Sequence, residues 1–249
     1  MKKRLVLLIG VLPIVFAGCS KDDDTDVISL KVSEKTLYFE DKYQIEATSE
    51  AAINYTVENE YHAKVSETGL VAARFVGETN VLLSNGKDTK NFKVIVRPKS
   101  NLYPEPDVKF GDSKSSIIAK FGTPDSETSS AIAYADYSNT APVLMFAFDS
   151  ANKLDSYILM VKSMYSSTLA DFLLERYLAV SEKDGLFLFI NGLNTTTATM
   201  AIGLQLYNTS FWSVTYIPST STSTKSALLK SSNNTTDTNA FDELLRQLQ

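Results

Sequence analysis

The chain has 249 residues, of which 44% are apolar, 21% charged and 10% aromatic. This composition is typical of a globular protein, and it is sufficient for two modest hydrophobic cores or one large one. A formal charge of −5 argues against a nucleic-acid binder, because there is no basic excess to neutralise phosphates. One cysteine allows no internal disulfide, and one histidine leaves too few ligands for a Cys/His zinc site. A Ser–His or Cys–His catalytic pair would depend on His62 alone.

The N-terminus has the layout of a secretory signal. Positively charged residues 2–4 precede an apolar run over 5–16, which is too short to span a bilayer as a helix. The run ends in the sequence FAGC, whose cysteine is Cys19. This pattern resembles the lipobox of bacterial lipoproteins, which implies a signal peptide over 1–18, cleavage before Cys19, and acylation of its thiol. Two or three acyl chains would anchor the protein stably to a membrane.

An acidic run, SKDDD, directly follows the cysteine. It resembles the signal with which lipoproteins of Bacteroidetes are exported to the outer face of the outer membrane. The alternative interpretation is a solvated acidic tether, which is common near processed termini. We therefore expect residues 19–26 to form an acidic tether, and the protein to be lipid-anchored to the outer membrane at the cell surface.

Residues 27–98 show short segments of alternating apolar and polar residues, separated by turn residues, which is typical of an all-β module. The strongest turn is Asn85–Gly86, a dipeptide that favours a tight hairpin between two strands. The expected strands are centred on 28–32, 36–39, 43–47, 53–57, 81–83 and 92–96.

The sequence SETGLVAA over 66–73, followed by Gly77, resembles the group 2 bacterial Ig-like domain. Tyr55 stands where that family usually has a tryptophan. The resemblance implies a β-sandwich that acts as a spacer or adhesion unit and has no catalytic residues. His62 lies in a connecting segment of this module, and we expect it to be a surface histidine.

A proline-containing linker over 99–106 is expected to join this module to a second one over 107–218. Helix signals surround 113–121, with Ser113 or Asp112 as N-cap and Gly122 as the stop. Strands are expected over 131–137, 142–149 and 153–163. The order then repeats, with a helix over 167–176 and strands over 186–190, 197–206 and 211–217. We therefore predict an α+β domain built from a duplicated helix-plus-antiparallel-sheet unit.

The first half of this domain contains an ordered series of motif residues: Gly111, Ser113, Gly122, Pro124, Tyr134, Phe146, Phe148, Asp149, Lys153 and Leu154. The series resembles the fold shared by β-lactamase-inhibitor proteins and small outer-membrane assembly lipoproteins of the SmpA type. In those proteins the open face of the sheet holds a protein partner. The resemblance is one of fold, and it implies little about the function of this chain.

A partner-binding row is expected in the last strand, where Trp212, Val214 and Tyr216 alternate with Phe211, Ser213, Thr215 and Ile217. One of these rows must face away from the helices. If the row with Trp212 and Tyr216 were exposed, it would suit a protein or glycan partner, since aromatic residues dominate binding hot spots. The alternative is that the row packs against the linker, the Ig-like module or the C-terminal tail.

Residues 219–249 are rich in Ser, Thr and Asn and end in a short amphipathic stretch containing Phe241, Leu244, Leu245 and Leu248. The acidic residues lie in tethers and turns, as solvated charges do, so we expect no catalytic residues, no metal site and no cofactor. The expected function is a lipid-anchored, non-catalytic binding protein of the cell envelope, with an Ig-like stalk and an α+β head for an unknown protein or glycan. The alternative is a periplasm-facing structural lipoprotein that assists outer-membrane assembly.

Overall fold

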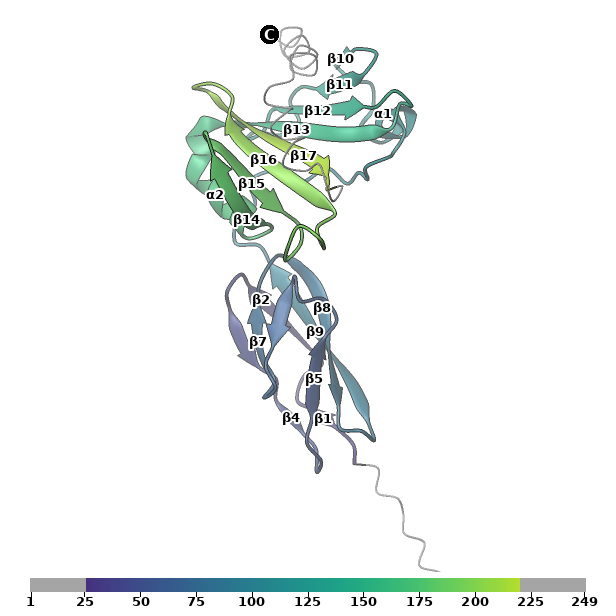
Figure 1. Ribbon diagram of the computed structural model, residues 1–249, viewed down its shortest axis with the longest axis vertical. Coiled ribbons are helices and arrows are strands. Elements are labelled where there is room, and N and C mark those ends of the chain that lie inside the picture. The colour runs from purple at the N-terminus through teal and green to yellow at the C-terminus, as the bar shows by residue number, and fades with distance from the viewer. Residues whose placement is uncertain (1–25, 220–249) are drawn as a thin grey trace, which may run out of the picture.

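The computed structural model describes residues 26–219. The expected signal peptide, Cys19, nearly all of the acidic tether, and the tail from residue 220 onward lie outside the described residues. Two units follow one another along the longest axis of the molecule (Figure 1): an N-terminal sandwich, residues 26–98, and a C-terminal unit, residues 107–218. Strand β1 lies at the end of the sandwich that is remote from the C-terminal unit (Figure 1). In the described range no helix is long and apolar enough to cross a membrane.

The N-terminal sandwich is built from two main sheets. The four-stranded sheet has the order β2-β9-β8-β5, and the three-stranded sheet has the order β3-β7-β6. Strand β2 pairs with β9 in parallel, and the remaining pairs are antiparallel. A short pair, β1 and β4, closes one end. The strands are β1 (Ser29–Leu30), β2 (Glu34–Tyr38), β3 (Lys42–Gln44), β4 (Ala47–Thr48), β5 (Asn54–Val57), β6 (Ala63–Val65), β7 (Leu70–Ala73), β8 (Gly77–Ser84) and β9 (Thr89–Arg97).

Alternation along the strands builds the core of the sandwich. Val81 and Leu83 of β8 are fully buried together with Phe92 of β9, whereas Leu82 between them is exposed. The predicted Asn85–Gly86 turn joins these two strands, and the Asn85 side chain accepts hydrogen bonds from two following backbone amides. The prediction of a hairpin at this place is therefore confirmed.

Two glycines of the sandwich are required by close packing. A β-carbon on Gly69, which has a φ of +81°, would lie 2.7 Å from the ring of Tyr55. A β-carbon on Gly77, which has a φ of +144°, would lie 2.2 Å from the ring of His62. Both distances are too short for real atoms, so each glycine lets an aromatic ring rest directly on the backbone.

The C-terminal unit contains one eight-stranded antiparallel sheet in the order β10-β11-β12-β13-β17-β16-β15-β14. Each half of the sheet is preceded by one helix, and the halves meet where β13 pairs with β17. The strands are β10 (Ser126–Glu127), β11 (Ala131–Tyr134), β12 (Val143–Phe148), β13 (Leu154–Lys162), β14 (Leu178–Lys183), β15 (Leu186–Ile190), β16 (Met200–Leu206) and β17 (Phe211–Pro218). Each half thus has four strands where the sequence predicted three. The additional strands, β10 and β14, are the two edges of the sheet.

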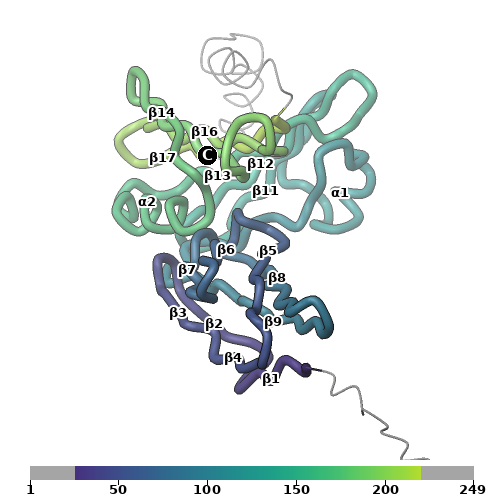
Figure 2. Tube along the Cα trace, turned by 60° about the horizontal axis from the view of Figure 1, so that its bottom comes forward, coloured from purple at the N-terminus to yellow at the C-terminus, as the bar shows by residue number. Residues whose placement is uncertain are grey.

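The two helices pack on one face of this sheet, α1 (Lys114–Phe121) beside its first half and α2 (Ser166–Leu174) beside its second (Figure 1 and Figure 2). Ser113 caps α1 as predicted, because its hydroxyl accepts a hydrogen bond of 3.1 Å from the Ser116 amide. Gly122 ends this helix with a φ of +89°. Leu144 and Phe146 of β12 face the helices.

The segment expected to be a linker contributes to the core of the C-terminal unit. Leu102 and Tyr103 are buried there, and the backbone carbonyl of Leu102 accepts a hydrogen bond from the Thr140 hydroxyl. The Tyr137 hydroxyl donates to the carbonyl of Pro104 at 2.8 Å. The structure therefore differs from a semi-rigid spacer over 99–106, since apolar side chains within the proline-containing segment are themselves core residues.

Candidate functional site at the junction of the two units

The predicted partner-binding row of β17 lies in the core, which corrects the expectation of an exposed surface. Val214 and Tyr216 have no exposed surface. Trp212 is half-buried, and its indole nitrogen donates a hydrogen bond of 2.8 Å to the Ser166 hydroxyl at the start of α2. The Tyr216 hydroxyl lies 3.0 Å from that of Tyr103, inside the unit. Val214 and Tyr216 therefore stabilise the fold and are not available to a partner, whereas Trp212 is only partly buried against this core.

The pairing of β17 with β13 explains this orientation. Tyr216 is opposite Tyr157, and Val214 is opposite Leu159, so the row shares the face of the sheet on which the helices lie. The Tyr157 and Tyr216 rings stack with centroids 4.4 Å apart. Both rows of β17 contain aromatic residues, so alternation in the sequence did not indicate which one faces the helices.

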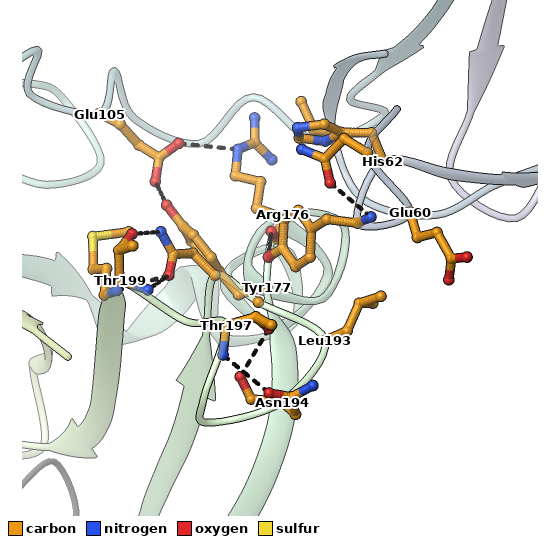
Figure 3. A pocket seen from close by; sticks show the side chains of 15 residues that line it. Glu60, His62, Glu105, Arg176, Tyr177, Leu193, Asn194, Thr197 and Thr199 are labelled. Atoms are coloured by element: carbon orange, nitrogen blue, oxygen red, sulfur yellow. Dashed lines mark hydrogen bonds and ion pairs between the residues drawn. The ribbon is translucent and has the colours of Figure 1, made fainter. Parts of the chain in front are cut away.

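A cavity of about 600 Å³ lies instead where the two units meet (Figure 3). The sandwich contributes residues 59–62 and Val76 to its wall. The connecting segment contributes Glu105, and the C-terminal unit contributes the pair Arg176–Tyr177 after α2 and residues from the loop between β15 and β16. Side chains from four distant parts of the chain therefore line one space.

Arg176 and Glu105 form the charged centre of the cavity wall (Figure 3). The Nε of Arg176 lies 3.4 Å from a carboxylate oxygen of Glu105, and the guanidinium stacks 3.7 Å above the ring of Phe172. The guanidinium also donates to the Phe172 carbonyl at 3.1 Å. The arginine side chain is only 11% exposed, so its charge depends for compensation on the carboxylates of Glu105 and, at 3.9 Å, Glu175.

Glu105 also connects the cavity to a cluster of buried tyrosines. Its carboxylate accepts hydrogen bonds from the hydroxyls of Tyr177 and, at 3.4 Å, Tyr216. Burial, with the negative charge of Glu105 among the further causes, raises the pKa of both phenols well above the ordinary value. The raised pKa values agree with the role of both phenols as donors in these hydrogen bonds.

Hydrogen bonds across the junction fix the two units to each other. The Tyr61 hydroxyl of the sandwich donates to the carbonyls of Arg176, at 2.6 Å, and Ile190, at 3.3 Å. The amide of Val76 donates to the Glu175 carbonyl at 2.9 Å. The buried Glu175 carboxylate accepts from the backbone amides of 99 and 100, where the chain leaves the sandwich.

His62 belongs to this junction, which differs from the expected surface position. Its side chain is half-buried, and Nδ1 lies 3.1 Å from the Phe75 carbonyl oxygen. Tyr61, its neighbour, stacks on Phe75 with centroids 4.5 Å apart. The one feature of the sequence that relates to this position of His62 is Gly77, whose missing β-carbon makes room for the imidazole.

The loop between β15 and β16 forms the remaining wall. Hydrogen bonds from backbone amides to the side chains of two asparagines fix the shape of this loop. The Asn191 side-chain oxygen accepts from the amides of Thr199, at 2.9 Å, and Met200, at 2.7 Å. Asn194 accepts from the amides of 196 and 197.

Within residues 26–219 no three His, Cys, Asp or Glu side chains are grouped as for a metal ion. The cavity thus combines a charged centre with a polar rim, an arrangement suited to binding.

Comparison with known proteins yields structural matches only. No family model and no curated protein matches the chain. A structure of domains 5–6 of the S-layer protein SbsC matches over 77% of this chain and 83% of its own length, with 12% identity and a TM-score of 0.25. A larger SbsC structure, domains 4–9, has a TM-score of 0.26 at 12% identity over 78% of this chain, which spans 27% of that structure. An intimin mutant from EHEC O157:H7 has a TM-score of 0.24 at 13% identity, over 68% of this chain and 84% of the intimin chain. TM-scores this low do not establish a shared fold for the whole chain.

Proposed function

We propose that the protein is a lipid-anchored, non-catalytic binding protein of the cell envelope, in which an Ig-like sandwich presents an α+β head to a protein or glycan partner. One observation supports this most strongly: the sandwich lies between the N-terminal end of the described chain and the head (Figure 1). A lipid on Cys19 would therefore hold the end of the sandwich remote from the head. The sandwich would then act as a stalk that sets the distance between head and membrane.

The junction supports this function, because a stalk directs its head only if the two units keep a fixed orientation. Tyr61, Val76 and the amides of residues 99 and 100 all donate hydrogen bonds to groups of the head. Domains joined by a flexible linker and a small interface would move relative to each other. Here the direct hydrogen bonds hold the stalk and the head in one fixed orientation.

The cavity at the junction is the candidate contact site for the partner, in place of the buried row of β17. Its mouth includes exposed side chains from both units, Glu60 of the sandwich and Thr197 of the head. A site between domains that combines polar groups with a few apolar walls is a common place for recognition. Its Arg176–Glu105 pair supplies one charge of each sign, and Glu60 adds an exposed carboxylate, which favours a polar ligand that carries hydrogen-bond donors.

Protease treatment of intact cells tests the location. Cells expressing the full-length protein are treated with protease and blotted for the head, with a Cys19→Ala variant as the control for lipid anchoring. The surface location predicts that the head signal disappears in intact cells. Protection until the outer membrane is opened would contradict it and would favour the periplasmic assembly role.

Binding of the chain from Ser20 onward to envelope polysaccharides and to extracted surface proteins tests the cavity. The variant Glu60→Arg combined with Thr197→Arg places two long cations at the mouth, and it should abolish binding while the fold is retained. Glu34→Arg, an exposed position on β2 of the sandwich, is the matched control and should bind as the parent does. Equal affinity of the double variant and the control would contradict the site assignment.

A further inference from the structure

The face of the large sheet opposite the helices contains a second apolar cluster, which we call the open-face cluster. Its buried members are Ala131, Ala133, Met145, Ile158 and Met160, and Val143 and Phe211 pack against it. All of these residues belong to strands β11, β12, β13 and β17. In the described part of the chain, no helix or loop residue belongs to this cluster, and α1 and α2 pack on the other face.

The two methionines at the centre of the open-face cluster are almost completely buried, Met145 at 1% exposed and Met160 at 2%. Neighbouring strands shield the base of a side chain that stands on a sheet, but they do not cover its tip. Burial of apolar surface contributes about 25 cal/mol per Å². A face of this composition therefore favours an apolar occupant.

The remaining sequence of the same chain contains a segment of suitable chemistry. Residues 219–240 are rich in Ser, Thr and Asn, with Leu228 and Leu229 as their only large apolar residues, whereas Phe241, Leu244, Leu245 and Leu248 follow at spacings that place them on one side of a helix. The acidic and basic side chains of Glu243 and Arg246 would lie on the opposite side. Alone, so short a helix is unstable, so it needs a surface against which to form.

The path of the chain brings this segment within reach. Strand β17 ends at Pro218, at the end of the sheet where β13 begins. Ala147 and Ser156 lie on the same face of the sheet as the open-face cluster, and they pair with each other at that end. Residues 219–240, at roughly 3.3 Å per extended residue, are more than long enough to cross the sheet.

We propose that the amphipathic segment 241–248 docks on the open-face cluster of its own chain, with Leu244 and Leu245 over Met145 and Met160. The flexible, unbranched methionine side chains adapt readily to the leucines of such a segment. A sheet face that would otherwise expose a continuous apolar patch is thereby covered without a second molecule. This docking is independent of the function proposed above.

Disulfide trapping tests the docking in the chain from Ser20 onward, which lacks the only native cysteine, Cys19. Val143→Cys is combined with Leu245→Cys, and the matched control combines it with Arg246→Cys on the opposite side of the segment. Docking predicts an intramolecular disulfide that forms several-fold faster in the Leu245 pair. Equal rates in the two pairs, no disulfide, or only disulfide-linked dimers would overturn it, and the last result would indicate a second copy as occupant.

Methionine oxidation by peroxide provides a second readout. In the parent chain Met145 and Met160 should oxidise slowly, whereas the variant Leu244→Glu with Leu245→Glu should oxidise them several-fold faster. Met164, which is 78% exposed, is an internal standard that should react equally in both proteins. Unchanged protection of Met145 and Met160 in the variant would overturn the proposal.

Discussion

The hydroxyl of Tyr61 donates a 2.6 Å hydrogen bond to the backbone carbonyl of Arg176, although 115 residues separate them in the sequence. The tyrosine belongs to the sandwich and the arginine to the segment after α2, so the bond crosses the junction. Next to it, the amide of Val76 donates to the carbonyl of Glu175. Paired polar groups therefore fix the orientation of the two units.

Replacing Tyr61 with Phe should weaken the junction while leaving the aromatic packing on Phe75 intact. The carbonyls of Arg176 and Ile190 would both lose a donor, which costs about 1–2 kcal/mol in the free energy of unfolding. Small-angle scattering should show a wider distribution of interdomain distances. Tyr55→Phe, in strand β5 of the same sandwich, is the control and should change neither quantity.

Glu175 should be more sensitive than Tyr61, because its carboxylate is buried and accepts hydrogen bonds from two backbone amides. Glu175→Ala leaves both amides without this acceptor, and we expect a loss of about 2–3 kcal/mol in denaturant unfolding. Glu175→Gln retains one acceptor oxygen and should lose less. If Ala and Gln variants were equally stable, the carboxylate would not hold the amides of residues 99 and 100.

Tyr216 should respond to substitution as a core residue. Tyr216→Ala removes a fully buried ring, and large-to-small changes of this kind cost about 3–5 kcal/mol. Tyr216→Phe removes only the hydroxyl that contacts Tyr103 and Glu105, and it should cost about 1 kcal/mol. Thermal unfolding followed by circular dichroism distinguishes the two. A Tyr216→Ala protein as stable as the parent would mean that the ring is not buried.

The order of elements could be predicted from the sequence where local patterns determine structure. The hairpin at Asn85–Gly86 and the helix between Ser113 and Gly122 both depend on turn or cap residues within a few positions. The edge strand β10 has only two residues, and β14 is largely exposed and contains an irregular register near Ala179, so neither shows a clear alternation.

The candidate site could not be predicted in this way, because its residues meet only through tertiary structure. Tyr61, Glu105 and Arg176 come from a loop of the sandwich, the connecting segment and the end of a helix. None has a neighbour in sequence that indicates a binding role. Trp212 and Tyr216 attracted the prediction because they are aromatic and alternate, but strand pairing with β13 turns them toward the helices.

Acidification should destabilise the sandwich at the end nearest the expected anchor. Hydrogen bonds from the backbone amide of Ile28, at 2.9 Å, and from that of Thr89 lower the pKa of Asp88, although partial burial opposes the shift. Burial opposes ionisation of Asp26 as well, but the amides of residues 50 and 51 outweigh it, and its pKa is also lowered.

A carboxyl whose pKa is lower in the folded than in the unfolded state adds stability above its unfolded pKa, near 3.9 for aspartate, and loses it as the pH falls through the folded value. The free energy of unfolding should therefore decrease below about pH 4, and Asp88→Asn should flatten this part of the profile. Urea titrations at a series of pH values measure the slope, with Glu67→Gln, an exposed carboxylate of the same sandwich, as the control. If the free energy of unfolding of Asp88→Asn depended on pH in the same way as that of the parent, the hydrogen bond from the Ile28 amide to Asp88 would make no contribution to the acid sensitivity of the sandwich.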